Sequence, residues 1–251
     1  MSPRVRQSSG GTGTEMARLH EQAQLLALGD SALLIEFPPG IDEGTNSAVH
    51  ALARWIAINL RVGIMETVPA YHTLTVFYDP YIYRFDELKS LLADIEFSLI
   101  TPEHPSRSVV VPVCYDLSLA PDLPLLAEHC GMSIEEVVAL HTRASYRVFF
   151  LGFKPGFAYL GGLDARLHMP RKASPRALVP AGAVAIGGEQ TGIYPQASPG
   201  GWQIIGRTPS RLFDAGTEPP CLLQAGDLVN FQAISLQEFL AQNSFARGGS
   251  P

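Results

Sequence analysis

Apolar and polar residues follow helical and strand-like periods in turn along the first hundred positions. Residues 32–37 form a short apolar run that ends at two prolines, as expected of a buried strand. Residues 46–60 repeat apolar side chains every three to four positions, which predicts a helix, and residues 86–95 repeat this pattern after two acidic residues. The segments 64–68 and 73–78 between these helices are typical of strands.

This order of strand, helix, two strands and helix predicts a small ferredoxin-like α+β sandwich. A Pro-containing stretch at 101–106 is the expected linker, and a strand begins at Val109. Ser133 opens a capping box for a helix that reaches about His141. From Tyr146 onward, short strands separated by Gly and Pro turns predict a β-barrel or sandwich with few helices.

The expected organisation is therefore two domains flanked by two tails. We expect disordered tails at 1–22 and 242–251, an α+β domain over 23–101 and a β-barrel domain over 109–241.

Composition narrows the class of protein. The chain has 251 residues, of which 46% are hydrophobic and 17% charged, and this excludes a disordered protein and a coiled coil. The net charge of −6 does not favour nucleic acid as the main partner, and no apolar run is long enough to span a membrane. Three widely spaced cysteines favour a reducing compartment, so we expect a cytoplasmic protein.

One segment, residues 152–209, differs from the rest of the chain. It holds 11 of the 23 glycines and 7 of the 20 prolines, and it carries six basic residues against two acidic ones. Its net charge of +4 in an acidic protein favours an anionic ligand, because loops held on a rigid scaffold commonly carry function.

Basic side chains stand in two turns of this segment. Lys154 lies in a Gly-rich, aromatic loop, where it can meet a carboxylate or phosphate or be a plain surface lysine. Arg171 and Arg176 flank two prolines, and their guanidinium groups suit bidentate binding of an anion. The alternative for this second turn is a solvated basic surface.

Two further stretches supply polar and aromatic candidates. In the first, a double glycine precedes Glu189, Gln190 and Thr191, with Tyr194 just beyond, which fits either a ligand site or a hairpin turn in water. In the second, Gly201–Thr208 matches a P-loop apart from an arginine in place of lysine. We reject a P-loop because Pro209 follows at once and a P-loop must open a helix. Trp202 and Arg207 are the candidates there.

The seven histidines show no metal-binding spacing, so we expect no metal site. His141, at the end of its predicted helix, is either a proton-handling group or a structural histidine.

Taken together, these stretches resemble the family of 5-oxoprolinase B subunits, also known as allophanate hydrolase subunit 1, which includes the KipI-type kinase inhibitors. The resemblance rests on Gly152–Leu163, Pro170–Arg176, Val179–Pro195 and Ser198–Phe213. It implies a ferredoxin-like domain followed by a cyclophilin-like β-barrel. It also implies two partners, a cyclophilin-like C subunit (similar to allophanate hydrolase subunit 2) and an A subunit. With them, such a chain would open 5-oxoproline to L-glutamate using ATP.

On this hypothesis, Glu189 or His141 handles protons and the remaining candidates bind the substrate or an anion. These binding candidates are Lys154, Arg171, Arg176, Gln190, Thr191, Tyr194, Trp202 and Arg207. We expect the chain to be inactive alone. Two alternatives stay open, namely a subunit of an allophanate hydrolase or urea carboxylase assembly and a KipI-like inhibitor of a histidine kinase.

Overall fold

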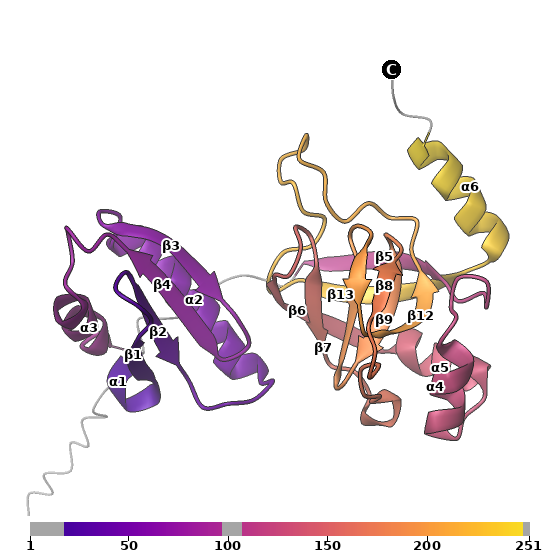
Figure 1. Ribbon diagram of the computed structural model, residues 1–251, viewed down its shortest axis with the longest axis horizontal. Helices are drawn as coiled ribbons and strands as arrows, with labels where there is room; N and C mark the ends of the chain where they lie inside the picture. Colours follow the sequence, from indigo (N-terminus) through magenta and orange to yellow (C-terminus); the bar gives the residue numbers. More distant parts are fainter. Residues whose placement is uncertain (1–17, 97–106, 248–251) are drawn as a thin grey trace, which may run out of the picture.

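The computed structural model describes residues 18–96 and 107–247, with side chains described as far as Gln242. Within these ranges the chain forms an N-terminal α+β unit and a C-terminal barrel, each with a hydrophobic core of its own (Figure 1). The expected linker at 101–106 and most of the expected N-terminal tail lie outside the described residues.

The N-terminal unit packs helices against a four-stranded antiparallel sheet with strand order β1-β2-β4-β3. Its elements are α1 (Leu19–Gln22), β1 (Gln24–Ala27), β2 (Ala32–Glu36), α2 (Glu43–Asn59), β3 (Ile64–Pro69), β4 (Thr73–Tyr78) and α3 (Phe85–Ala93). The strands and helices predicted from hydrophobic periodicity are therefore confirmed, while α1 and β1 were not predicted.

The ferredoxin-like pattern is only partly present in this unit. The series β2-α2-β3-β4-α3 follows it, but the edge beside β2 is occupied by β1, which precedes β2 in the chain. A ferredoxin-like domain would place a strand following the second helix at that edge. The expected disordered tail is also too long, because Leu19 is fully buried and its N–H donates to the carbonyl of Ile95.

The C-terminal unit is built on a closed seven-stranded barrel with strand order β10-β7-β6-β13-β5-β12-β9. The barrel strands are β5 (Ser108–Cys114), β6 (Ser145–Leu151), β7 (Ala158–Gly161), β9 (Ala183–Gly187), β10 (Gln190–Ile193), β12 (Gln203–Arg207) and β13 (Leu228–Ile234). Beside it, β8 (Arg176–Val179) and β11 (Ser198–Gly200) form a two-stranded ribbon. The predicted β-barrel is confirmed.

The barrel closes through its first and last strands. β5 and β13 run parallel over seven residue pairs, and Arg107 donates two hydrogen bonds to Asp227 at 3.2 and 2.6 Å at the start of this pairing. Parallel pairing aligns the beginnings of both strands, so the chain enters the barrel at one end and leaves β13 at the other.

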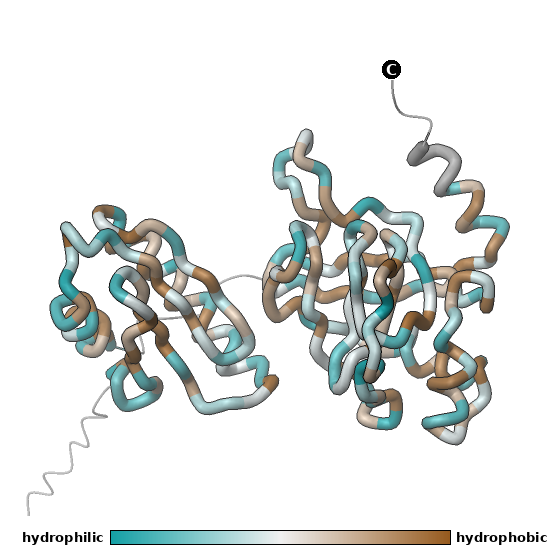
Figure 2. The backbone as a smooth tube through the Cα atoms, in the orientation of Figure 1, coloured by the Kyte–Doolittle hydropathy of each residue, from teal (hydrophilic) through white to brown (hydrophobic). Residues whose placement is uncertain are grey.

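Three α-helices and one 3₁₀ turn accompany the barrel. They are α4 (Leu123–Cys130), α5 (Ile134–Arg143), η2 (Ala165–Leu167) and α6 (Leu236–Arg247). The predicted capping box opens α5, with Ser133 and Glu136 bonded reciprocally. α4 was missed, and the expected disordered tail from residue 242 is contradicted because α6 continues to Arg247. The backbone changes repeatedly between hydrophilic and hydrophobic residues, as expected where each element buries one face (Figure 2).

The two units contact each other through side chains from α2 and the β3–β4 turn. His50 bonds to the carbonyl of Phe149, and Arg147 donates to the Ser47 hydroxyl at 3.0 Å. Tyr71 in the turn lies with its ring centroid 5.3 Å from that of Phe149. Burial lowers the pKa of His50, which favours the neutral imidazole at this contact.

Candidate functional site

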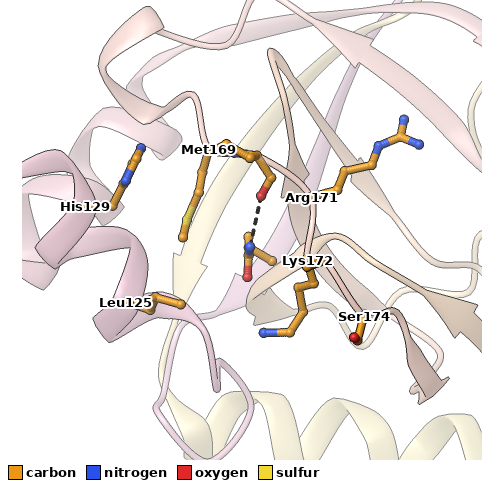
Figure 3. Close-up of a pocket in the computed structure, with 9 residues that line it drawn as sticks. Leu125, His129, Met169, Arg171, Lys172 and Ser174 are labelled. Carbon is orange, nitrogen blue, oxygen red and sulfur yellow. Dashed lines mark hydrogen bonds between the residues drawn. The ribbon is translucent and has the colours of Figure 1, made fainter.

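The basic turn around Arg171 is held against the barrel by backbone groups. The Gln203 amide donates to the carbonyl of Pro170 at 3.0 Å, and the backbone N–H of Lys172 donates to the carbonyl of Gly201 at 2.7 Å. Figure 3 shows Arg171 and Lys172 pointing away from each other from this turn. The turn is therefore a fixed support from which Arg171 extends into solvent.

Asp122 holds the far side of the same turn. Its carboxylate, whose side chain is only 5% exposed, accepts from Arg176 at 2.6 Å, from Lys172 at 3.3 Å and from the backbone N–H of Ile204 at 2.7 Å. Burial alone would raise the pKa of Asp122, but these hydrogen bonds and the charge of Arg176 lower it overall. Two cations share one carboxylate, so the group keeps a net positive charge.

The prediction for Arg176 needs correction on this point. Its Nη2 is committed to Asp122, and its side chain is only 26% exposed. A guanidinium in this position orients the turn and adds positive charge to the surroundings, whereas Arg171 is the arginine whose side chain faces outward.

An aromatic pocket of about 290 Å³ opens beside Arg171. The Arg171 guanidinium lies 5.5 Å from the centre of the Trp202 ring, within the range of a cation–π contact. The pocket is lined by Phe153, Phe157, Tyr159, Arg171, Lys172, Pro175, Tyr194, Pro199, Gly200, Gly201 and Trp202. Flat apolar walls with a cation at the rim suit a small cyclic anion.

Glycines form the wall behind two of these rings. A Cβ atom at Gly187 would lie 2.6 Å from the Trp202 ring, and one at Gly200 would lie 2.5 Å from the Tyr194 hydroxyl. Both distances are too short for any other residue without movement of the ring. The Gly-rich motifs are thus explained by close packing behind the pocket, and they place Trp202 and Tyr194 where the pocket needs them.

Phe153 forms one rim of the pocket in a strained backbone conformation. Its φ is +64°, in the left-handed region that non-glycine residues rarely adopt, and the side chain is 58% exposed. Lys154 follows in the same turn, where its N–H donates to the carbonyl of Gly152 at 2.7 Å. Phe153 lines the pocket and Lys154 does not. Strain of this kind concentrates at ligand sites, so Phe153 strengthens the assignment of the pocket.

A second pocket, of about 470 Å³, shares the basic turn as a wall. It lies between that turn and α4, with His129 and Leu125 from α4 facing Met169 (Figure 3). Its lining is mostly apolar, with Lys172 and Ser174 as polar members.

Glu189 and Gln190 lie on the hairpin between β9 and β10. Gly187 pairs with Gln190, so Gly188 and Glu189 form a two-residue turn, with Gly188 at a φ of +69°. Glu189 is exposed there, as the hairpin alternative describes, and it is not among the residues that line the aromatic pocket. The Gln190 Oε1 is buried with no partner among the described residues.

His141 and Thr191 lie in the interior of the barrel. Both are fully buried, and His141 bonds through Nδ1 to the Tyr115 hydroxyl at 2.7 Å and through Nε2 to the Thr191 hydroxyl at 3.0 Å. The ring also stacks on Phe231 at 4.6 Å. Burial lowers the pKa of His141 to about 3, so the ring stays neutral. The structure supports the structural alternative for this histidine and does not place it at a surface.

Arg207 and the rejected P-loop both belong to β12. The Gly201–Thr208 stretch forms a barrel strand, with no helix at its end, so the rejection of a P-loop is confirmed. Arg207 donates through Nε to the carbonyl of Ala181 at 2.8 Å and lies 5.9 Å from the centre of the Phe239 ring of α6. These contacts connect β12 to α6, and they leave Arg207 outside the lining of the aromatic pocket.

Of the predicted residues, the structure thus brings Arg171, Tyr194 and Trp202 together in one pocket. It places Glu189, His141 and Arg207 elsewhere. Sequence reasoning missed Asp122, because nothing near it in the sequence indicates a partner 50 residues away. It treated the aromatic loop only as a wall, although Phe157 and Tyr159 in that loop are pocket residues.

Comparison with known proteins now gives the class. Residues 23–223 match the family model described as "Carboxyltransferase domain, subdomain C and D". The chain is 44% identical over 229 residues to the B subunit of the 5-oxoprolinase of Bacillus subtilis (strain 168), covering 87% of this chain and 95% of that protein. The chain therefore belongs to the carboxyltransferase C and D subdomain family, which includes proteins named as B subunits of 5-oxoprolinase.

Solved structures agree on the fold. The crystal structure of TTHA0988 is 39% identical, with a TM-score of 0.72 over 81% of this chain, and this chain spans only 40% of that longer protein. The Kluyveromyces lactis urea carboxylase is 20% identical, with a TM-score of 0.70 over 87% of this chain, and this chain covers 22% of it. The latter likeness shows the fold alone, a mixed α/β chain with the carboxyltransferase type of barrel. No helix among the described residues has the length and apolar character to cross a membrane.

Proposed function

We propose that this chain acts as the B subunit of a 5-oxoprolinase assembly, which opens 5-oxo-L-proline to L-glutamate at the expense of ATP. The observation that carries the proposal is the aromatic pocket beside Arg171. The names of the most similar relatives add independent support. We also propose that the N-terminal unit is a ferredoxin-like domain in which β1 replaces the usual edge strand.

The pocket matches the chemistry of a small lactam acid. Its volume of about 290 Å³ is at the lower end of the usual ~300–1,000 Å³ for ligand sites, which favours a small ring over a nucleotide. Trp202 and Tyr194 offer apolar faces for the ring. Arg171, held above Trp202, offers two parallel N–H donors for the carboxylate. We propose that Lys154 and Arg176 add only to the positive potential around the site.

Partners follow from the proposed role. We propose that two further proteins join this chain in the active assembly in the cytoplasm, a cyclophilin-like C subunit similar to allophanate hydrolase subunit 2, and an A subunit. The interface with the C subunit should exceed the ~1,200–2,000 Å² of a standard interface, since obligate contacts are larger. Co-expression and size-exclusion chromatography test this, with one shared peak expected. Two separate peaks at micromolar concentration would contradict it.

ATP belongs to the assembled complex in this proposal. The loop with P-loop spacing forms strand β12, and the described part of the chain offers no other glycine loop that opens a helix toward a phosphate. The described residues therefore do not fit a P-loop nucleotide site, and we assign ATP no step here.

Reconstitution tests the function. The purified chain, its candidate A and C subunits, and all mixtures of the three would be assayed for ATP hydrolysis that depends on 5-oxo-L-proline. We expect turnover only when this chain is combined with both partners. The proposal is overturned if the partners turn over equally without this chain, or if this chain is active alone.

A second candidate is a subunit of an allophanate hydrolase or urea carboxylase assembly, which the carboxyltransferase description of the family model favours. The same mixtures, assayed with allophanate and urea in place of 5-oxo-L-proline, distinguish the two. A KipI-like role would instead appear as inhibition of histidine kinase autophosphorylation by this chain without any partner.

A further inference from the structure

The side chain of Tyr71 crosses from the N-terminal unit to the aromatic cluster of the barrel. Tyr71 lies in the turn between β3 and β4, and its ring is edge-on to Phe150 at 4.9 Å and 6.2 Å from Tyr159. Tyr159 lines the aromatic pocket and packs on Trp202 at 6.2 Å. A continuous series of ring contacts therefore connects this N-terminal turn to the pocket.

The turn that carries Tyr71 is held in place from below. Asn46 of α2 is fully buried, and its amide donates to the carbonyl of Ala70 at 2.9 Å and to that of Tyr71 at 3.3 Å. Next to it, the backbone N–H of Phe37 donates to the carbonyl of His72 at 2.9 Å. A turn fixed at successive carbonyls presents the Tyr71 side chain in one orientation.

The Tyr71 hydroxyl is buried and has no hydrogen-bond partner among the described residues. A buried hydroxyl without a partner costs roughly 1–3 kcal/mol, so its presence calls for an explanation. Phenylalanine would make the same ring contacts without this cost. A ligand that supplies the missing partner is one explanation.

The charges nearby indicate which ligand atoms would fit. Burial raises the pKa of Tyr71, while the positive charge of Arg171 acts on the same hydroxyl in the opposite direction. Arg171 acts likewise on the hydroxyls of Tyr159 and Tyr194. The guanidinium is thus close enough to influence all three phenols, and a phenol near a cation is a suitable second donor to a bound anion.

We propose that Tyr71 is a ligand-binding residue of the aromatic pocket, and that its hydroxyl donates a hydrogen bond to the carboxylate held by Arg171. The N-terminal unit then supplies one wall of a site that is otherwise built by the barrel. This inference rests on the proposed function for the identity of the ligand, a small cyclic carboxylate.

The test compares the full-length wild-type chain with Tyr71→Phe, which removes only the hydroxyl, and with Tyr81→Phe, a control at a residue 98% exposed in the same unit. Two probes are titrated by calorimetry, 5-oxo-L-proline and 2-pyrrolidinone, the same lactam without its carboxylate. The Michaelis constant for 5-oxo-L-proline is measured in the reconstituted assembly. Thermal unfolding checks that each variant is folded.

We expect Tyr71→Phe to bind 5-oxo-L-proline roughly 10- to 100-fold more weakly, with an equal or higher melting temperature, because a hydrogen bond to a charged group is lost. Binding of 2-pyrrolidinone and the behaviour of Tyr81→Phe should be unchanged. Equal affinity of wild type and Tyr71→Phe for 5-oxo-L-proline would overturn this inference and leave the proposed function intact. If the wild type neither binds 5-oxo-L-proline nor supports its turnover, both are overturned.

Discussion

Two groups of polar residues in the barrel contrast sharply. Around Arg171, the cation and the tyrosines face an open pocket, and Arg171 itself is exposed. Around His141, a histidine, a threonine and a tyrosine are fully or almost fully enclosed and bonded to one another. Both groups contain residue types used in catalysis. Only the first can meet a substrate, so accessibility separates the site from the core more reliably than residue type does.

The largest effect should follow from emptying the inner group. His141→Ala removes a buried ring that stacks on Phe231 and leaves the Tyr115 and Thr191 hydroxyls without their partner. We expect a loss of about 3–5 kcal/mol in unfolding free energy, or roughly 10 °C in Tm. Urea and thermal unfolding measure this. A Tm within a degree or two of wild type would show that His141 does not support the core.

The outer group should respond in activity instead. Arg171→Ala should lower kcat/KM of the assembled enzyme by about 2–3 kcal/mol, or roughly 30- to 150-fold, because a charged contact to the carboxylate is lost. Stability should change by less than about 0.5 kcal/mol, since Arg171 is exposed. Arg171→Lys should restore little, because a point charge cannot reproduce the fork of a guanidinium.

Arg166→Ala is the matched control for Arg171. Arg166 lies in the same basic segment, is exposed, and pairs with Asp164 at 2.7 Å away from the pocket. Its removal should leave kcat/KM unchanged. Similar losses for both arginines would indicate a general effect of charge and would argue against a specific contact at Arg171.

Acid sharpens the comparison between the two groups. The pKa of His141 is about 3 in the folded chain, whereas a histidine in an unfolded chain titrates near ~6.5. Between these values only the unfolded state takes up the proton, so stability present above pH ~6.5 is lost as the pH falls, by up to ~1.4 kcal/mol per unit. Urea unfolding at pH 7 and pH 5 measures the loss. His141→Gln should depend less on pH, and parallel profiles would contradict the assignment.

The smallest effect is expected at Glu189. This carboxylate lies on an exposed hairpin turn, outside the lining of the pocket. Glu189→Gln should change stability by less than about 0.5 kcal/mol and leave kcat/KM of the assembly within about twofold. A drop of 100-fold or more would restore Glu189 as a proton-handling group and move the site toward the hairpin.

Local patterns in the sequence were sufficient for most of the fold. The apolar period of α2 and the capping box at Ser133 depend only on neighbours along the chain, and both predictions are confirmed. The helix α4 was missed because Pro121 and Pro124 obscure its start, although a proline in the first turn of a helix is tolerated. The strand β1 has only four residues, too few to display a period.

The site could be predicted only in part, because it depends on contacts between distant residues. The positive charge of the segment correctly indicated Arg171, yet Arg176 has the same charge and is taken up by Asp122, 54 residues earlier. The polar run at 189–191 separates in three dimensions. Its first residue reaches solvent and its last reaches the core, since successive side chains of a strand point to opposite faces.

The parallel pairing of β5 and β13 also determines where attachments to this chain would project. The N-terminal unit precedes the start of β5, and α6 follows the end of β13, so the two leave the barrel at opposite ends. A fluorescent reporter or an affinity handle fused after α6 would thus stand clear of the N-terminal unit and of the Tyr71 turn. Such a fusion is the natural design for watching assembly without disturbing the ligand pocket.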